Sequence, residues 1–216
     1  MKAFWIKTNW FIKTIFPNYI WRMPTCEKIV YLTFDDGPTP EITNWVLNQL
    51  QKFEAKATFF CVGNNIEKNP AIFNQIIADG HTIGNHTFNH VKGWNTSAND
   101  YVNEVEKCEE TIEKSSVKRQ KSRLFRPPYG KIKPSQAKLL RSKGYKIIMW
   151  DVLSGDYDTT ISKEKCLKNV LHHVESGSII VFHDSVKAFP NLEYTLPKTL
   201  SFLTEKGYKM KAIDFD

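Results

Sequence analysis

Several features that mark common classes of protein are missing from this chain. None of its apolar runs is long enough to span a membrane, and it has no Gly-rich loop of the G-x-G-x-x-G or Walker type. No arginine-rich recognition helix or other nucleic-acid signature occurs, although the formal net charge is +7. These absences argue against a membrane span, a nucleotide-binding fold and a nucleic-acid partner.

Cysteine is scarce and is not arranged for metal binding or redox chemistry. The chain has four cysteines, which stand far apart and include no C-x-x-C pair: Cys26, Cys61, Cys108 and Cys166. A cysteine zinc site and a dithiol redox motif therefore find no support. We expect free thiols rather than disulfides.

The first 27 residues are rich in aromatic side chains but lack the sequence features of a signal peptide. Polar residues from Lys7 to Asn9, and Lys13, interrupt the apolar stretch, and no small-residue cleavage site follows. The compartment therefore stays open between the cytoplasm and the cell envelope. The side chains near one helical face are Phe4, Trp5, Thr8, Phe11, Ile12 and Ile15. We expect a helix packed on the domain, with a membrane-interface helix as the alternative.

One stretch, Ile29–Phe34, reads as a buried strand that ends on two adjacent acids. Asp35 and Asp36 follow it directly, and Gly37-Pro38 then turns the chain. Unpaired charge at the end of a buried strand is costly, so two acids there call for a cation. A plain polar turn is the alternative.

Strand-like and helical segments alternate after residue 28. The expected strands are 29–34, 57–62, 81–84, 123–125, 146–150, 178–182 and 208–213. The expected helices are 40–53, with Thr39 as N-cap, 70–78, 99–114, 134–143, 162–175 and 193–206. This alternation predicts an α/β fold with about seven parallel strands, either as a barrel or as an open doubly wound sheet.

Polar side chains recur where these strands end. They are Asp35-Asp36, His86 and His90, Arg126, Asp151 and Asp156, and His183-Asp184. In a barrel the carboxyl ends of the strands meet on one face, and that face carries function. We therefore expect these groups to form a site.

The spacing of His86 and His90 favours metal binding. Residues four apart on a helical turn face the same side, so both imidazoles can chelate one ion. Two histidines with one aspartate leave open positions for water and substrate, and zinc is the first expectation. The zincin motif would have Glu directly after the first His, where this chain has Thr87.

Two further residues point to acid–base chemistry. Arg126 precedes Pro-Pro at a strand end, which favours pairing with a carboxylate of the site over a plain surface position. His183 ends an apolar strand, and an imidazole titrates near neutral pH, which suits a general acid. A satisfied core histidine is the alternative.

Five ordered motifs now stand out: Thr33–Pro38 (TFDDGP), His86–His90 (HTFNH), Arg126–Gly130 (RPPYG), Asp156-Tyr157 and Val181–His183. Together they resemble the motifs of the polysaccharide deacetylase family (carbohydrate esterase family four), the homology domain of nodulation-type chitooligosaccharide deacetylases. The first three are highly specific in combination, and the match covers most of the chain after about residue 28. The family usually has Trp in place of Tyr157 and often Leu in place of Val181, which bears on the shape of the acetyl pocket.

The resemblance implies a distorted, incomplete (β/α) barrel, with residues 1–27 as a segment packed on a catalytic domain of residues 28–216. It also implies a metal-dependent hydrolase that removes acetyl groups from N-acetylated sugars of peptidoglycan or a chitin-like polymer. The partner is then an N-acetylated glycan, and the cofactor is one divalent ion, Zn²⁺ first and Co²⁺ second. A monomer is the default assembly.

The motif match also assigns roles to residues. Asp36, His86 and His90 would bind the metal, and Asp35, held by Arg126, would be the base that acts on metal-activated water.

The remaining roles follow from the same match. His183 would be the general acid, tuned by Asp156, and the backbone N–H of Tyr129 would help hold the oxyanion. The residues implied to line the substrate pocket are Tyr157, Val181 and Pro128.

Three other readings stay open. An esterase that acts on O-acetylated glycans such as xylan would use the same motifs. A non-catalytic sugar-binding homologue would not need the complete set of acid, base and ligands. A metal-dependent phosphatase typically has its strand-end acids separated by one residue, whereas Asp35 and Asp36 are adjacent.

Overall fold

A curled parallel sheet forms the centre of the protein. The structure is a computed structural model, and it describes residues 5–117 and 122–215. The strands are β1 (Ile29–Asp35), β2 (Ala57–Cys61), β3 (Thr82–Asn85), β4 (Leu124–Phe125), β5 (Lys146–Ile147), β6 (Val152–Leu153), β7 (Ile179–His183) and β8 (Lys209–Met210). Their order is β5-β4-β3-β2-β1-β7-β6, and β8 also pairs with β1. Every pair of strands is parallel. The predicted incomplete barrel is confirmed.

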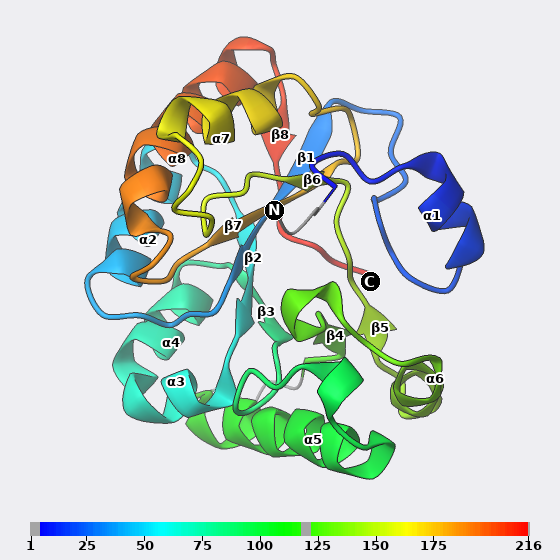
Figure 1. Ribbon diagram of the computed structural model, residues 1–216. Helices are drawn as coiled ribbons and strands as arrows, with labels where there is room; N and C mark the ends of the chain where they lie inside the picture. The colour runs from blue at the N-terminus through cyan, green and yellow to red at the C-terminus, as the bar shows by residue number, and fades with distance from the viewer. Residues whose placement is uncertain (1–4, 118–121, 216) are drawn as a thin grey trace.

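Helices cover the outer side of the half-barrel (Figure 1). The α-helices are α1 (Trp10–Ile15), α2 (Ile42–Lys52), α3 (Gly63–Lys68), α4 (Pro70–Ala78), α5 (Ala98–Ser115), α6 (Pro134–Ser142), α7 (Lys163–Leu171) and α8 (Phe189–Glu205). Two 3₁₀ turns, η1 (Gly93–Asn95) and η2 (Pro128–Gly130), lie in the loops. None of the described helices is long and apolar enough to cross a membrane.

The outward side chains of the central strands form the main core. Phe34 on β1 is in register with Phe59 on β2 and Phe182 on β7. Its ring stacks on theirs at centroid distances of 5.0 and 5.9 Å. Burying one such ring stabilises the fold by about 1.5–3 kcal/mol. Because side chains alternate along a strand, residues such as Asp35 face the other, concave side.

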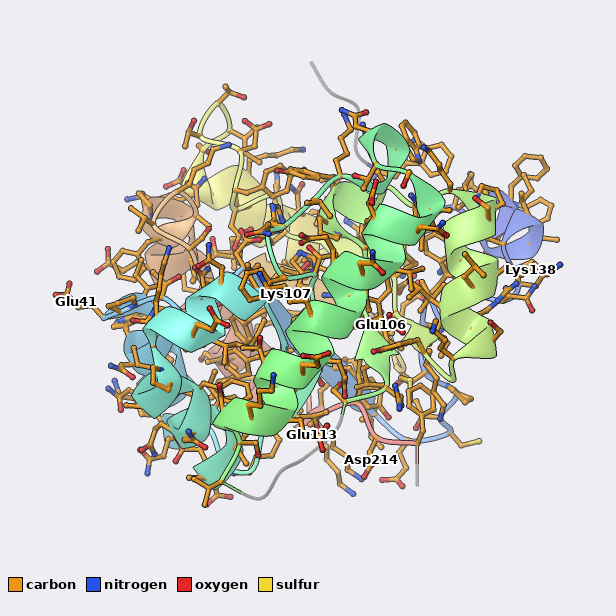
Figure 2. The ribbon with its side chains drawn as sticks, turned by 90° about the horizontal axis from the view of Figure 1, so that it is seen from below. Glu41, Glu106, Lys107, Glu113, Lys138 and Asp214 are labelled. Atoms are coloured by element: carbon orange, nitrogen blue, oxygen red, sulfur yellow. The ribbon has the colours of Figure 1, made fainter. Side chains whose placement is uncertain are left out.

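Helix α5 shows how the helices shield this core. Its apolar stripe, which includes Val102 and Val105, is buried, as the periodicity predicts. The outer face carries Glu106, Lys107 and Glu113 (Figure 2). A charged outer face suits solvent, so the helix is amphipathic in the expected sense.

Several elements differ from the prediction. Helix α2 begins at Ile42 rather than at Pro40, after Glu41 with a positive φ of 65°, and α7 ends at Leu171 rather than at 175. The expected strand 146–150 ends at Ile147, because Ile148 pairs with Ile20 of the N-terminal segment. The chain then forms β6, which was not predicted. Helix α3 was also missed, since its sequence GNNIEK contains a single buried apolar side chain, Ile66. Helix α8 begins at Phe189 rather than 193, with a proline in its first turn, and the last strand is limited to Lys209–Met210.

The N-terminal segment lies against the domain through apolar side chains, backbone bonds and lysines. Trp21 and Met23 are buried in hydrophobic clusters of the domain. The helix is limited to Trp10–Ile15, so Trp5 and Thr8 precede it, and Phe4 lies outside the described residues. Lys7 pairs with Val152 in an antiparallel bridge. The ring of Trp10 is 73% exposed. The expected helix is thus shorter than its apolar pattern suggests.

Candidate metal and acid–base site

The end of β1 places Asp35 inside the barrel beside β7. Asp35 is in register with His183, and only 4% of the aspartate is exposed. Neighbouring parallel strands bring such partners to one face. The two residues that were predicted as base and acid therefore lie on adjacent strands, although they are far apart in sequence.

Arg126 holds Asp35 from across the barrel. Its Nη1 donates to Asp35 Oδ1 at 2.7 Å and to Thr33 Oγ1 at 2.7 Å. The other guanidinium nitrogens donate to the backbone oxygens of Ile148 and Met149. The guanidinium is fully buried, yet it is paired and hydrogen-bonded, which is what a buried charge requires. This network fixes the orientation of the Asp35 carboxylate.

Asp36, His86 and His90 form a group that could hold a metal ion. One ligand atom of each lies within 4.8 Å of those of the other two. His90 Nε2 is 3.3 Å and His86 Nε2 is 3.9 Å from Asp36 Oδ1. A carboxylate and two imidazoles suit a divalent transition metal and leave positions for water or substrate. The donor set fits the expected cofactor.

His86 is prepared for metal binding by its hydrogen bond. Its Nδ1 lies 2.8 Å from the backbone oxygen of Arg126. A carbonyl only accepts, so Nδ1 carries the proton and Nε2 presents its lone pair to the group. Burial lowers the pKa of His86 to about 4, which keeps the ring neutral at pH 7. Neutral imidazole is the form that binds a metal.

The two histidines come together by a different route from the one predicted. Residues 86–90 form a loop after β3 instead of a helical turn. Thr87 and His90 both have positive φ, 63° and 54°. These left-handed residues fold the loop back on itself, so the i, i+4 spacing brings the imidazoles together without a helix.

Asp184 belongs to this site, although the sequence pattern assigned it no role beyond its place at a strand end. The Gly37 N–H donates to its Oδ1 at 3.1 Å, and the Thr43 hydroxyl donates to its Oδ2 at 2.5 Å. A Cβ on Gly37 would collide with that Oδ2, so only glycine fits. These contacts hold the turn that places Asp36, with φ 84°, beside the histidines. The signal that could have found Asp184 is its position directly after His183.

His183 is held by Asp156. Its Nδ1 lies 2.8 Å from Asp156 Oδ1, and its backbone N–H donates to Oδ2 at 2.8 Å. Burial opposes the charged ring, but the charge and hydrogen bond of Asp156 raise the pKa of His183 to about 9. The imidazole is therefore protonated at pH 7. Tyr157 packs edge-on against it, with 5.0 Å between ring centroids.

The remaining predicted residues differ in exposure: Tyr129 lies at the surface beside His90, whereas the two others are buried. The Tyr129 ring lies 4.7 Å from that of His90 and is largely exposed. Val181 and Pro128 are buried.

Asp151 does not belong to the site, contrary to the expectation for strand-end acids. Its carboxylate accepts from Lys7, Lys13 and Ser178. Asp151 directly precedes β6 and lies beside Ser178, at the amino end of β7, whereas the site lies at the carboxyl end of that strand. The acid therefore anchors that segment and takes no part in the cluster around β1.

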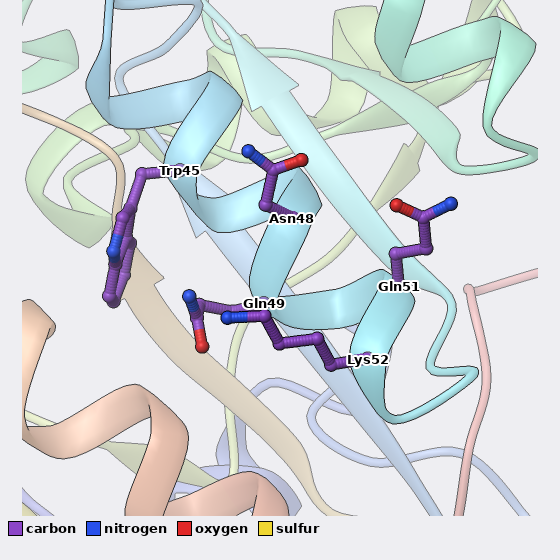
Figure 3. Close-up of a pocket in the computed structure, with 5 residues that line it drawn as sticks. All are labelled: Trp45, Asn48, Gln49, Gln51 and Lys52. Carbon is purple, nitrogen blue, oxygen red and sulfur yellow. The ribbon is translucent and has the colours of Figure 1, made fainter.

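A hollow elsewhere offers no comparable chemistry. It lies along α2 and is lined by Trp45, Asn48, Gln49, Gln51 and Lys52 (Figure 3). This lining contains no carboxylate, imidazole or thiol that could act as base, acid or metal ligand. The acid, base and ligand candidates lie instead at the ends of β1, β3 and β7.

Acid, base and ligand candidates at the carboxyl ends of parallel strands are typical of an α/β enzyme, and the protein has the fold of an α/β half-barrel. A family model described as polysaccharide deacetylase matches residues 22–148. The chain belongs to the polysaccharide deacetylase family, carbohydrate esterase family four, and is a hydrolase of that family. The resemblance seen in the sequence is thus confirmed.

Individual relatives cover nearly the whole chain. It is 34% identical to a peptidoglycan-N-acetylglucosamine deacetylase of Bacillus cereus over 89% of this chain and 90% of the relative. It resembles the crystal structure of a peptidoglycan N-acetylglucosamine deacetylase with TM-score 0.87, 31% identity and 95% of each chain covered. A family-four pseudoenzyme from Bacillus anthracis has the same fold, with TM-score 0.80, 26% identity, and 90% of this chain and 66% of that chain covered.

Proposed function

We propose that this protein hydrolyses the N-acetyl groups of N-acetylglucosamine units in peptidoglycan, and that residues 28–216 carry the activity. The observation that carries the proposal is the register of Asp35 with His183, which sets a base and an acid side by side next to the Asp-His-His group. The names of the two most similar proteins described above support the choice of substrate.

The proposed ligands of a divalent ion are Asp36, His86 and His90, with Zn²⁺ expected first. When bound, such an ion polarises the amide carbonyl and activates water, which an amide requires because its carbonyl is a poor electrophile. The proton of His86 on Nδ1 and the turn held by Asp184 support this assignment.

Asp35 is proposed as the general base. Its carboxylate takes a proton as water attacks, and Arg126 keeps it oriented and supplies its counter-charge. The backbone N–H of Tyr129 is the proposed donor to the oxyanion that develops on the substrate.

His183 is proposed as the general acid. The amine cannot leave as an anion, so a proton must reach its nitrogen. With its pKa raised to about 9, His183 holds that proton at neutral pH, and Asp156 keeps the ring in place. Tyr157, Val181 and Pro128 are proposed to line the acetyl pocket. Asp35 and His183 thus divide the proposed base and acid roles between two different residues.

Two alternatives use the same fold. An O-acetyl esterase would need the same groups. A non-catalytic homologue is the second alternative, since a structural relative is named a pseudoenzyme. The presence of base, acid and all three ligand candidates in this chain favours an active enzyme.

An acetate-release screen separates these alternatives. The protein is stripped with a chelator, reloaded with Zn²⁺ or Co²⁺, and incubated with peptidoglycan, N-acetylglucosamine oligomers and acetylated xylan. We expect metal-dependent release from the N-acetylated glycans. Release from xylan alone would replace the proposal with the esterase. No release from any glycan by the metal-loaded protein would favour the non-catalytic homologue.

A further inference from the structure

Helix α3 and the residue before it hold the turn that follows β1. Asn65 on α3 donates from its Nδ2 to the backbone oxygen of Asp36 at 2.7 Å. The N–H of Val62 donates to the backbone oxygen of Gly37 at 3.0 Å. Two consecutive carbonyls of the turn therefore have their partners on one short element.

The end of α3 extends this contact to a third carbonyl of the turn. Asn69, the residue that ends the helix, donates from its Nδ2 to the backbone oxygen of Pro38 at 3.2 Å. The same Nδ2 lies 3.2 Å from the backbone oxygen of Asn65, to which it also donates. The two asparagines thus bind the turn as a connected pair.

The start of α3 holds the loop that carries the two histidines. The N–H groups of Gly63 and Asn64 donate to the backbone oxygens of Thr87 and Phe88 at 3.0 and 2.9 Å. A Cβ on Gly63 would be 2.6 Å from Cδ2 and 3.1 Å from Cα of Phe88, so helix and loop are in close contact. Helix α3 therefore binds both of the segments that present the candidate metal ligands.

The backbone of Asp36 requires such a restraint. Its φ of 84° lies in the left-handed region, which is unfavourable for a residue with a Cβ and persists only where the surroundings fix it. The half-buried Asn65 amide supplies the partner of the Asp36 carbonyl in this conformation. The direction of that peptide decides where the carboxylate of Asp36 points, and its Oδ1 lies 3.3 Å from His90 Nε2.

We propose that Asn65 is a positioning residue for the metal site. Its amide holds the backbone of Asp36 so that the carboxylate meets the two histidines, and it thereby raises the affinity for a divalent ion without being one of the ligand candidates. This role rests on the ligand set of the proposed function and goes beyond it by assigning the alignment of that set to α3. Groups that orient metal ligands typically contribute about 10–100-fold to metal affinity.

The first test compares Asn65→Ala with Asn74→Ala in the full chain. Asn74 is a half-buried asparagine on α4, and its Nδ2 donates to the backbone oxygens of Pro70 and Ser115 at 2.9 Å. Its replacement removes the same kind of bond outside the site. Zn²⁺ affinity is measured by competition with a chelating dye. We expect Asn65→Ala to weaken Zn²⁺ binding about tenfold or more, and Asn74→Ala to bind Zn²⁺ like the wild-type protein.

A second measurement separates positioning from stability. The visible absorption of bound Co²⁺ reports the arrangement of its ligands, and thermal unfolding of the metal-free protein reports the stability of the fold. We expect Asn65→Ala to change the Co²⁺ spectrum, whereas Asn74→Ala should change the Tm alone.

Two further variants isolate the hydrogen bond and replace Asn65→Ala if that variant does not fold. Asn65→Leu keeps the volume without a donor and should bind Zn²⁺ as weakly as Asn65→Ala. Asn65→Gln keeps an amide donor and should regain part of the affinity. Wild-type affinity in Asn65→Leu would overturn the role of the hydrogen bond.

The failure of this inference differs from the failure of the proposed function. Equal Zn²⁺ affinity and the same Co²⁺ spectrum in Asn65→Ala and Asn74→Ala would overturn the positioning role, whatever the activity. If the wild-type protein binds the ion but releases no acetate from any glycan, the proposed function fails, and the same comparison still decides the role of Asn65. A wild-type protein that binds no divalent ion would overturn the ligand set and this role together.

Discussion

At the scale of single residues, the site separates two adjacent acids by backbone conformation. Asp35 keeps strand geometry and points at Arg126, whereas Asp36 takes a φ of 84° and joins the histidines. Gly37 makes this possible because Asp184 occupies the space where a Cβ would be. Neighbouring carboxylates can therefore have different partners and different proposed roles.

Asp156→Asn tests how His183 is kept protonated. The carboxylate of Asp156 stabilises the imidazolium, so its removal should lower the pKa of His183 from about 9 towards its ordinary value near 6.5. A general acid is lost as pH rises through its pKa. The alkaline limb of the kcat/KM profile should therefore move to lower pH. Asp158→Asn serves as the control, since Asp158 bonds to Thr160. An alkaline limb that is unchanged in Asp156→Asn would rule out this role.

At the scale of elements, the periodicity of apolar residues predicted most strands and helices. It failed where the end of a strand depends on pairing with a segment distant in sequence. The strand at Ile29–Asp35 and the amphipathic α5 follow from their patterns. The end of β5 at Ile147 does not, because it depends on Ile20 from the other end of the chain. The rings of His86 and His90 do lie close together, with 5.0 Å between their centroids, but not because of a helical turn. Helical spacing predicted their proximity, whereas left-handed residues produce it.

The N-terminal segment supplies a prediction on stability. Asp151 is fully buried and accepts from Lys7 and Lys13, so these bonds hold residues 7–13 on the barrel. Burial opposes ionisation, but the hydrogen bonds from the two lysines lower the pKa of Asp151. Its contribution is present above the unfolded pKa of about 3.9 and is lost as pH falls through the lower folded value.

Asp151→Asn should lower the free energy of unfolding at pH 7 by about 2 kcal/mol, the scale of a charge-assisted hydrogen bond. Denaturant unfolding measures it, and the metal content should not change because Asp151 lies outside the site. Glu27→Gln removes an exposed pair with Lys209 and should leave the stability unchanged. Equal stability of Asp151→Asn and wild type would mean that the anchor contributes nothing.

At the scale of the whole molecule, the site draws residues from position 35 to position 184 onto one end of a single parallel sheet. The family motifs made the candidate residues visible, and the parallel sheet explains why distant strand ends meet. The sequence could not assign a role to Asp184 or exclude Asp151 from the site. The structure decides both cases through side-chain partners that the sequence does not reveal: Asp184 accepts from Gly37 and Thr43, whereas Asp151 accepts from Lys7 and Ser178.

The most direct test measures bound metal and acetate release together in wild type, Asp35→Asn and Asp36→Ala. The amide introduced by Asp35→Asn keeps an oxygen for the Arg126 Nη1–H but cannot take a proton, and it leaves the buried guanidinium without its counter-charge. Circular dichroism therefore checks the fold of this variant, for which we expect a lower Tm.

We predict that Asp35→Asn retains stoichiometric metal while turnover falls by about 10²–10⁴-fold, the usual contribution of a positioned base. Asp36→Ala should lose metal and recover part of its activity at high metal concentration. Loss of metal in Asp35→Asn with retention in Asp36→Ala would exchange the two roles. Near wild-type turnover in both variants would show that the reaction centre is not at the end of β1.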